Sequence, residues 1–152
     1  MTLGEEELFG PREELPGGLL KKQLGKVAQA GPESNPRDWD VRVVVDSIVV
    51  DPKCSQYAPK PTRGHRLVAT IRVETSPSFS AVSGRDASTS AWSTIGADGV
   101  DETPSPSVCD VDTMIPNQMR PAAKYRGQVS LDTAHTSGQL VLLQTFVWDF
   151  TK

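Results

Sequence analysis

Apolar and polar residues alternate most regularly between residues 39 and 50, in the stretch "WDVRVVVDSIVV". The other parity of this run carries two aspartates and an arginine. A period of two is typical of a β-strand with one buried face, so we predict a strand here, with Trp39 and Val43 in the core. The apolar parity is Trp39, Val41, Val43 and Val45.

Two further runs have the same period. In "RLVATIRVET", residues 66–75, Leu67 and Ile71 share an apolar face, and the opposite face carries charges that we expect to be exposed to solvent. In "SAWSTIGADGV", residues 90–100, a short strand with Trp92 on one face ends at Asp98-Gly99, a residue pair suited to a turn with positive φ.

The closing run "GQLVLLQTFVWDF", residues 138–150, is apolar on both parities. Its β-branched and aromatic residues, and the flanking Gly138, favour a strand over a helix. We predict a central strand with Leu142, Phe146 and Trp148 in the core. Its second face should be covered by the N-terminal segment or by an adjoining loop.

Strands of this kind, separated by connections rich in proline, serine and glycine, predict an all-β fold. The 12 glycines and 12 prolines require many turns, and no long amphipathic helix is evident. A chain of 152 residues is long enough for one core. We therefore expect a single antiparallel β-sandwich of about seven strands.

Residues 1–23 combine an acidic cluster with Pro11, Pro16, Gly17 and Gly18, which break any helix that the charges favour. We predict a mostly irregular N-terminal tail or arm, with a short helical turn near Glu5 to Phe9 as the alternative. The sandwich domain is expected over residues 24–152. The N-terminus lacks the basic and apolar regions of a signal peptide, so the protein is either cytosolic or has lost an export signal.

Cys54 and Cys109 lie in proline-rich connections beside strand-like runs. The chain has no CxxC motif and no histidine close to either cysteine, which argues against a zinc site. A disulfide and two buried thiols both remain possible. The even cysteine count and the loop positions favour the disulfide, which would close a loop of about 56 residues and stabilise the fold by roughly 4 kcal/mol.

Several stretches together resemble a known family. They are "LGKVAQAG" before "DWDVRVVVDSIVV", then "GHRLVATIRVET" and "STIGADGV", and finally "RGQVSLDT" before "GQLVLL". Their order resembles the telokin-like, immunoglobulin-fold domains of unknown function in exported proteins and lipoproteins of actinobacteria and other bacteria. The resemblance covers roughly residues 24 to 150. It implies an immunoglobulin-like sandwich, export and often a lipid-anchored N-terminal cysteine, but no agreed activity.

This chain shows neither the signal peptide nor the lipid-acceptor cysteine of that family. We therefore expect an extracellular or envelope-attached protein whose signal peptide has been removed.

Charge and motifs exclude several function classes. The net charge of −3 gives no basic field for nucleic acid, and the 13-residue closing run is too short and too polar for a membrane span. No GxSxG elbow, phosphate loop or dinucleotide fingerprint is present. We expect no enzymatic activity and no cofactor.

Two metal sites are conceivable alternatives. Acidic residues around the Asp98-Gly99 turn offer oxygen ligands for calcium, although their spacing fits no EF-hand. His65 and His135, with Met114 and Met119, offer ligands for copper. Paired carboxylates also leave a minor hydrolase open. The calcium candidates are Asp98, Asp101, Glu102, Asp110 and Asp112.

The expected function is that of a non-catalytic exported domain, acting as a binding or accessory module for an unknown protein or envelope partner. The long polar segments 76–91 and 100–121 are the predicted binding loops, because loops on a rigid sandwich commonly carry recognition residues. The ligand itself and the oligomeric state are not predicted.

Overall fold

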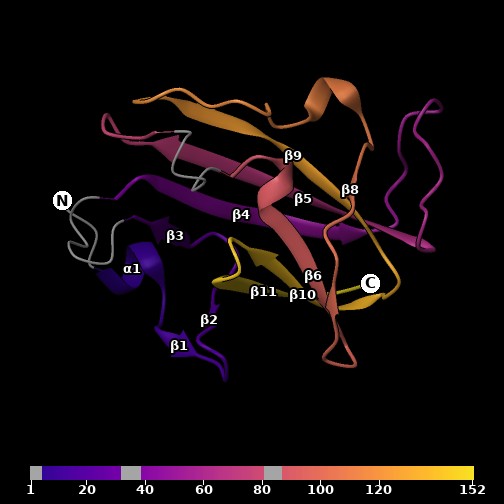
Figure 1. The fold of residues 1–152 in the computed structure, drawn as a ribbon, viewed down its shortest axis with the longest axis horizontal. Coiled ribbons are helices and arrows are strands. Elements are labelled where there is room, and N and C mark those ends of the chain that lie inside the picture. Colours follow the sequence, from indigo (N-terminus) through magenta and orange to yellow (C-terminus); the bar gives the residue numbers. More distant parts are fainter. Residues whose placement is uncertain (1–4, 32–38, 81–86) are drawn as a thin grey trace.

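A computed structural model describes residues 5–31, 39–80 and 87–152, and Figure 1 shows two β-sheets packed against each other. One sheet has the strand order β3-β4-β5-β9-β8, and the other has the order β1-β2-β11-β10-β6-β7. All pairings are antiparallel except that between β2 and β11. The predicted all-β antiparallel sandwich is confirmed.

Seven of the strands in the described part of the chain have four or more residues, which agrees with the predicted number. The remaining four are two-residue strands, of which β1, β7 and β8 lie at sheet edges and β2 lies between β1 and β11. The long strands are β3 (Val27–Ala30), β4 (Val41–Val50), β5 (His65–Thr75), β6 (Trp92–Gly96), β9 (Lys124–Thr133), β10 (Ser137–Leu142) and β11 (Phe146–Thr151). The short ones are β1 (Glu13–Glu14), β2 (Leu20–Lys21), β7 (Asp101–Glu102) and β8 (Pro106–Ser107).

The five-stranded sheet has an apolar inner face because its strands alternate as predicted. In β4, the alternation changes phase at a β-bulge: Val45 pairs with Ile71, but Ser47 pairs with Thr70, which leaves Asp46 as the extra residue. Beyond the bulge Ile48 pairs with Ala69, and Val50 pairs with Leu67. The bulge therefore keeps aliphatic residues on the inner face along the whole of β4.

The closing run is a hairpin, and our prediction of one continuous strand was wrong. β10 and β11 pair from Ser137↔Thr151 to Leu142↔Phe146, and a three-residue turn joins them. Leu143 and Gln144 both have φ of 53° in this turn. Positive φ is uncommon outside glycine, asparagine and aspartate, so the sequence carried no turn signal here.

The core lies between the two sheets. Five of the seven core residues predicted from the three longest patterns are at most 1% exposed, and Phe146 is 6% exposed. In this core the ring centroids of Trp92 and Trp148 lie 5.8 Å apart. The correctly predicted core residues are Val43, Leu67, Ile71, Leu142, Phe146 and Trp148.

Trp39 is the exception among the predicted core residues. It lies just before β4 begins and is only half-buried. Its ring packs against the guanidinium group of Arg42, 4.3 Å from the ring centroid. The apolar–polar alternation in the sequence begins at Trp39, two residues before β4 begins. Trp39 therefore lies outside the strand, and the prediction that it points into the core was wrong.

The N-terminal arm follows the edge of the six-stranded sheet. It contains the helix α1 (Glu5–Phe9), as the alternative prediction had it, followed by β1 and β2. The amide of Leu20 donates to Thr145 and that of Lys22 to Val147, at 2.8 Å each. Lys22 Nζ also donates to the carbonyl of Phe9 at 2.6 Å, which ties the helix to the arm. The domain boundary at residues 23 and 24 stays a prediction.

The predicted disulfide between Cys54 and Cys109 is present. It joins the connection after β4 to the segment that follows β8, 55 residues apart in the sequence. The amide of Ser55 also donates to the carbonyl of Cys109, at 3.0 Å. The bridge thus fastens two irregular segments outside the sheets.

Replacing Trp148 with alanine should destabilise the fold by about 3–5 kcal/mol, because it leaves a large cavity beside Trp92. Urea unfolding monitored by circular dichroism measures this change. Val111→Ala is the control, since Val111 is 74% exposed and should change stability little. A loss below about 1 kcal/mol for Trp148→Ala would show that packing of Trp148 in the core contributes little to stability.

A double variant with Cys54→Ser and Cys109→Ser should lose roughly 4 kcal/mol, because the unfolded chain regains the entropy of the closed loop. Thermal unfolding of the variant and of the wild type, each with and without reductant, measures this loss. The reductant should lower the melting temperature of the wild type only. Free alkylation of both thiols in oxidised protein would contradict the bridge.

Candidate functional site

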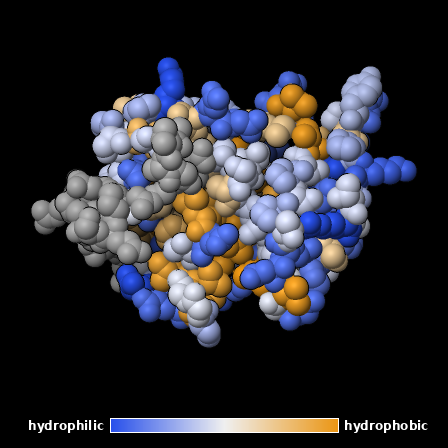
Figure 2. Space-filling model, in the orientation of Figure 1, coloured by the Kyte–Doolittle hydropathy of each residue, from blue (hydrophilic) through white to orange (hydrophobic). Residues whose placement is uncertain are grey.

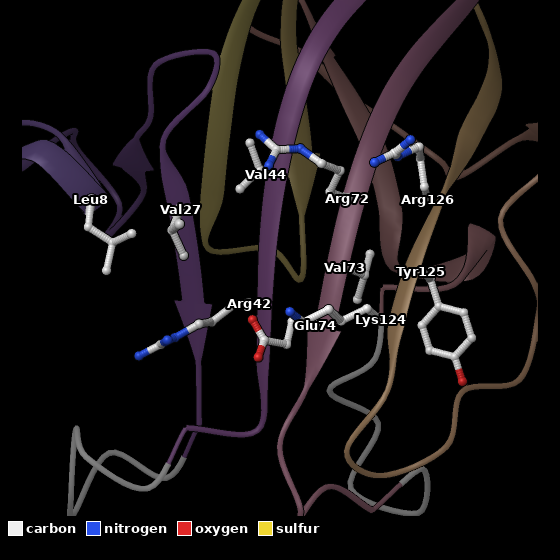
Figure 3. A pocket seen from close by; sticks show the side chains of 10 residues that line it. All are labelled: Leu8, Val27, Arg42, Val44, Arg72, Val73, Glu74, Lys124, Tyr125 and Arg126. Atoms are coloured by element: carbon white, nitrogen blue, oxygen red, sulfur yellow. The ribbon is translucent and has the colours of Figure 1, made fainter. Parts of the chain in front are cut away.

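A groove of about 550 Å³ crosses the outer face of the five-stranded sheet, beside helix α1 (Figure 3). Its volume lies within the range of small-molecule sites. The apolar part of the groove is formed by Leu8 of α1, Val27 of β3 and Val44 of β4, together with Val73 and Tyr125. Val27 and Val44 lie on the outer face and are 8% and 9% exposed.

The rest of the groove is strongly cationic. Four cations come from three adjacent strands, and Glu74 is the single carboxylate among the lining residues. The strand register arranges them in two cross-strand rows. One row is Val44, Arg72 and Arg126, and the other is Arg42, Glu74 and Lys124.

Two of the four cations are held by neighbouring groups. Arg42 lies against Trp39 and donates from Nε to Gln29 Oε1 at 2.9 Å. Arg72 donates from Nε and Nη2 to the two oxygens of Asp46, at 2.8 Å each. This hydrogen bonding, opposed by partial burial, holds the pKa of Asp46 below its usual value. The β-bulge places Asp46 where Arg72 can reach it.

The other two cations, Lys124 and Arg126, make no hydrogen bond or ion pair with any residue that the structure describes. Both side chains are exposed. Tyr125 between them is anchored, since its hydroxyl accepts from the amide of Arg120 at 2.7 Å. The charge of Arg126 acts on Asp46 over a longer distance. The groove therefore presents two exposed cations without a hydrogen-bond partner among the described residues, on a protein whose net charge is −3.

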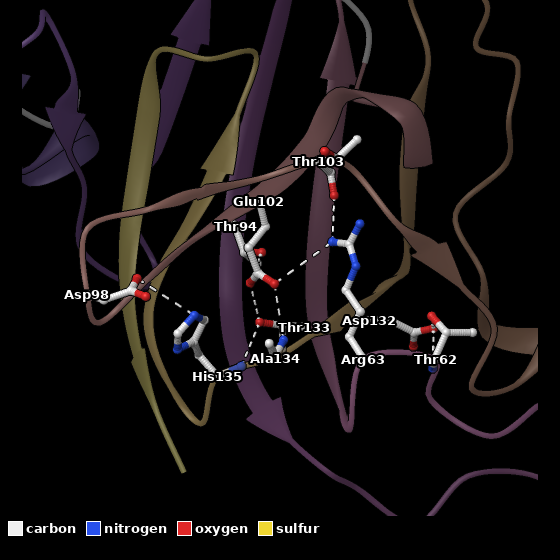
Figure 4. Close-up of polar contacts among 10 residues, drawn as sticks. All are labelled: Thr62, Arg63, Thr94, Asp98, Glu102, Thr103, Asp132, Thr133, Ala134 and His135. Carbon is white, nitrogen blue, oxygen red and sulfur yellow. Dashed lines mark hydrogen bonds and ion pairs between the residues drawn. The ribbon is translucent and has the colours of Figure 1, made fainter.

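A second polar cluster lies where the two sheets meet, around Glu102 of β7 (Figure 4). One oxygen of Glu102 accepts from Thr94 of β6 at 2.8 Å and from Thr133 of β9 at 2.5 Å. The other accepts from the amide of Ala134 at 3.1 Å. Burial opposes ionisation of Glu102, but these hydrogen bonds and nearby His135 outweigh it and hold its pKa below the usual value.

Asp51 has a similar environment. Burial again opposes ionisation, but the carboxylate is bound by Lys152 Nζ, by the amide of Arg66 and by His65 Nδ1, which lies 2.7 Å away. These contacts hold the pKa of Asp51 well below its usual range. A carboxylate with so many donors is stabilised as an anion, which suits a structural role better than proton transfer.

Asp132 and Arg66 form a buried pair on the outer side of the five-stranded sheet. Arg66 Nε lies 3.6 Å from Asp132 Oδ1 and donates to Ser107 at 3.0 Å. The other oxygen of Asp132 accepts from the amide and the hydroxyl of Thr62. These contacts fasten the segment near residue 62 and strand β8 to the sheet.

The calcium candidates do not meet at one site. Asp98 lies 3.7 Å from His135, and Asp101 is an exposed residue of β7. Asp110 accepts from the amide of Asp112 in a short 3-10 turn. Within residues 5–31, 39–80 and 87–152, no group of three or more histidine, cysteine, aspartate or glutamate side chains could hold a metal ion.

The copper candidates each have other contacts. His65 is bound to Asp51, and His135 lies beside Asp98. Met119 belongs to the hydrophobic core, and Met114 forms a backbone bridge to Gln128.

Of the two predicted binding segments, 100–121 is described in full and 76–91 only in part. Residues 81–86 of the 76–91 segment lie outside the described residues. In the 100–121 segment, Val100 and Val111 are 58% and 74% exposed, so this segment remains a rival surface to the groove. Figure 2 shows hydrophobic residues gathered near the middle of one face and mostly hydrophilic residues around them.

Comparisons with known proteins show the fold alone. No protein-family model matches the chain, and no curated protein matches it. A secreted protein from Mycobacterium tuberculosis, MPT63, has a similar structure, with a TM-score of 0.56 and 15% sequence identity. The similarity covers 88% of this chain and 98% of that chain. The expected membership of the telokin-like family is not shown by these matches.

Sequence reasoning missed the groove. Arg42 and Arg72 were recognised only as charges on solvent-facing positions, and Lys124 and Arg126 were not singled out. The alternation of charge was visible in each strand, but the register that joins the strands was not.

No helix in the described part of the chain is long and apolar enough to cross a bilayer.

The depressed pKa of Glu102 predicts a pH dependence of stability. Its contribution is fully present above the unfolded-state pKa of about 4.3 and is lost as the pH falls through the folded-state pKa. Glu102→Gln should therefore be less stable than wild type at pH 7 and should lose less stability below about pH 4.

Urea unfolding at a series of pH values measures this difference. Glu14→Gln is the control, because Glu14 lies in the exposed arm and its side chain pairs with the exposed Arg12. Equal pH dependence in Glu102→Gln and wild type would contradict the role of this cluster.

Proposed function

We propose that this chain is a non-catalytic, exported domain that binds another molecule through the groove on its five-stranded sheet. The observation that carries the proposal is the pair of exposed cations, Lys124 and Arg126, in a groove that is also lined by Leu8, Val27 and Val44. Unpaired cations and apolar side chains on one concave surface are typical of ligand sites. Attachment to the cell envelope is part of the same proposal.

Two observations support export. The disulfide between Cys54 and Cys109 is typical of proteins in oxidising compartments. The fold is also similar to that of a secreted mycobacterial protein. The identity of 15% is too low to transfer more than the fold, so export rests on the two observations together.

The absence of catalysis is supported by the state of two hydrogen-bonded carboxylates. Glu102 and Asp51 both have lowered pKa values and accept several hydrogen bonds. A general acid near neutral pH needs a raised carboxyl pKa, which is the opposite shift. The charged groups of the groove are mainly arginine and lysine, which suit binding of anions.

A mixed library of neutral, cationic and anionic fragments, followed by NMR chemical-shift mapping, tests the proposal. Binding fragments should shift backbone amides around residues 42–44, 72–74 and 124–126. The double variant Lys124→Ala with Arg126→Ala should weaken the anionic fragments. Lys53→Ala with Lys60→Ala removes the same charge outside the groove and is the matched control.

The proposal is wrong if the shifts gather in residues 100–121, or if both double variants weaken binding equally. Steady turnover of a substrate that is abolished by one carboxylate substitution in a folded variant would also overturn it.

A further inference from the structure

We infer that the groove binds a single-chain amphiphile with one anionic head group, a carboxylate or a phosphate. The head group would lie between Arg72 and Arg126, and the alkyl chain would lie against Val44, Val27 and Leu8. This inference rests on the proposed function, because it names the ligand class of the same groove.

The groove is polarised across the sheet. Three of its aliphatic residues come from α1, β3 and β4, and Lys124 and Arg126 come from β9 at the opposite side. Val73 of β5 and Tyr125 of β9 also line the groove. Figure 3 shows Leu8 and Val27 on one side of the groove and Arg126 on the other. From β3 to β9 is three strand spacings, roughly 14 Å. An amphiphile with a medium-length chain matches this separation of apolar and charged groups.

The pair Arg72 and Arg126 points to an anion. The two residues are direct cross-strand partners, and like charges in this position are destabilising. Arginine does not relieve the repulsion by losing its proton. Asp46 accepts two hydrogen bonds from Arg72. The charge of Arg126 also acts on Asp46, but Arg126 makes no hydrogen bond with any described residue. A head group with two or three oxygens can bind both guanidinium groups.

The neighbouring row argues for one head group rather than several. Glu74 lies between Arg42 and Lys124 as the cross-strand partner of both. An acidic peptide carries successive carboxylates, and a second carboxylate would approach Glu74 in that row. The repulsion from Glu74 therefore favours a ligand with a single anionic group and an apolar remainder.

Isothermal titration calorimetry with dodecanoate and dodecyl phosphate, below their micelle concentrations, tests the inference. One or both should bind with 1:1 saturation, and the two arms separate a carboxylate from a phosphate preference. Dodecyltrimethylammonium and dodecyl maltoside should bind at least about tenfold more weakly, because they lack the charge that Arg126 can bind.

Arg126→Ala should weaken the anionic ligand by about tenfold, which corresponds to loss of one charge-assisted contact. Lys53→Ala is the control and should not change the affinity. Val44→Ser should also weaken binding, and circular dichroism shows whether this variant is folded.

Equal binding of the cationic, neutral and anionic amphiphiles would overturn the inference, as would an unchanged affinity in Arg126→Ala. Tighter binding of a hexaglutamate peptide that competes with dodecanoate would replace the amphiphile with an acidic peptide. Neutral fragments mapped to the groove, with no binding of either anion, would leave the proposed function standing and refute only the ligand class.

Discussion

The phase of the side chains in the five-stranded sheet determines most of the structure. Strands β4, β5 and β9 direct aliphatic residues toward the second sheet and polar residues outward. The bulge at Asp46 keeps this phase in β4, where a regular strand would have turned the later apolar residues outward. It also supplies the carboxylate that holds Arg72. One irregularity thus serves both the core and the charge arrangement of the outer face.

The second sheet depends on the same inner face. The closing hairpin brings Trp148 against Trp92, and Glu102 links β7 to β6 and β9 at the sheet end. The disulfide acts outside the sheets, on segments with little regular structure. Core packing, a buried carboxylate and a covalent bridge therefore stabilise different parts of the molecule. On the outer face, Arg66 and Asp132 take part in these fold contacts, whereas Lys124 and Arg126 make no hydrogen bond or ion pair with any described residue.

The fold could be predicted from the sequence because strand alternation is a local signal. Val43, Leu67, Ile71 and Trp148 were placed correctly for this reason. The turn between β10 and β11 could not be predicted, because Leu143 and Gln144 adopt positive φ without the residues that usually favour it. Trp39 was misplaced because alternation does not show where a strand begins.

The candidate site was less predictable than the core. The register that sets Arg72 opposite Arg126 depends on pairing between residues 54 positions apart in the chain. A single strand shows only that a charge faces outward, and it does not show which charge lies beside it. The disulfide could be predicted from the sequence, since two cysteines allow one intramolecular pairing. The groove could be recognised only once the pairing of the strands was known.

Intermolecular nuclear Overhauser effects between bound dodecanoate and the protein test the central claim most directly, because they locate the ligand on the sheet. The account predicts contacts from the alkyl chain to the methyl groups of Val44, Val27 and Leu8. It also predicts that the protons next to the carboxylate contact the Arg126 side chain. Contacts to Val100 and Val111, with none to the three groove residues, would contradict the account.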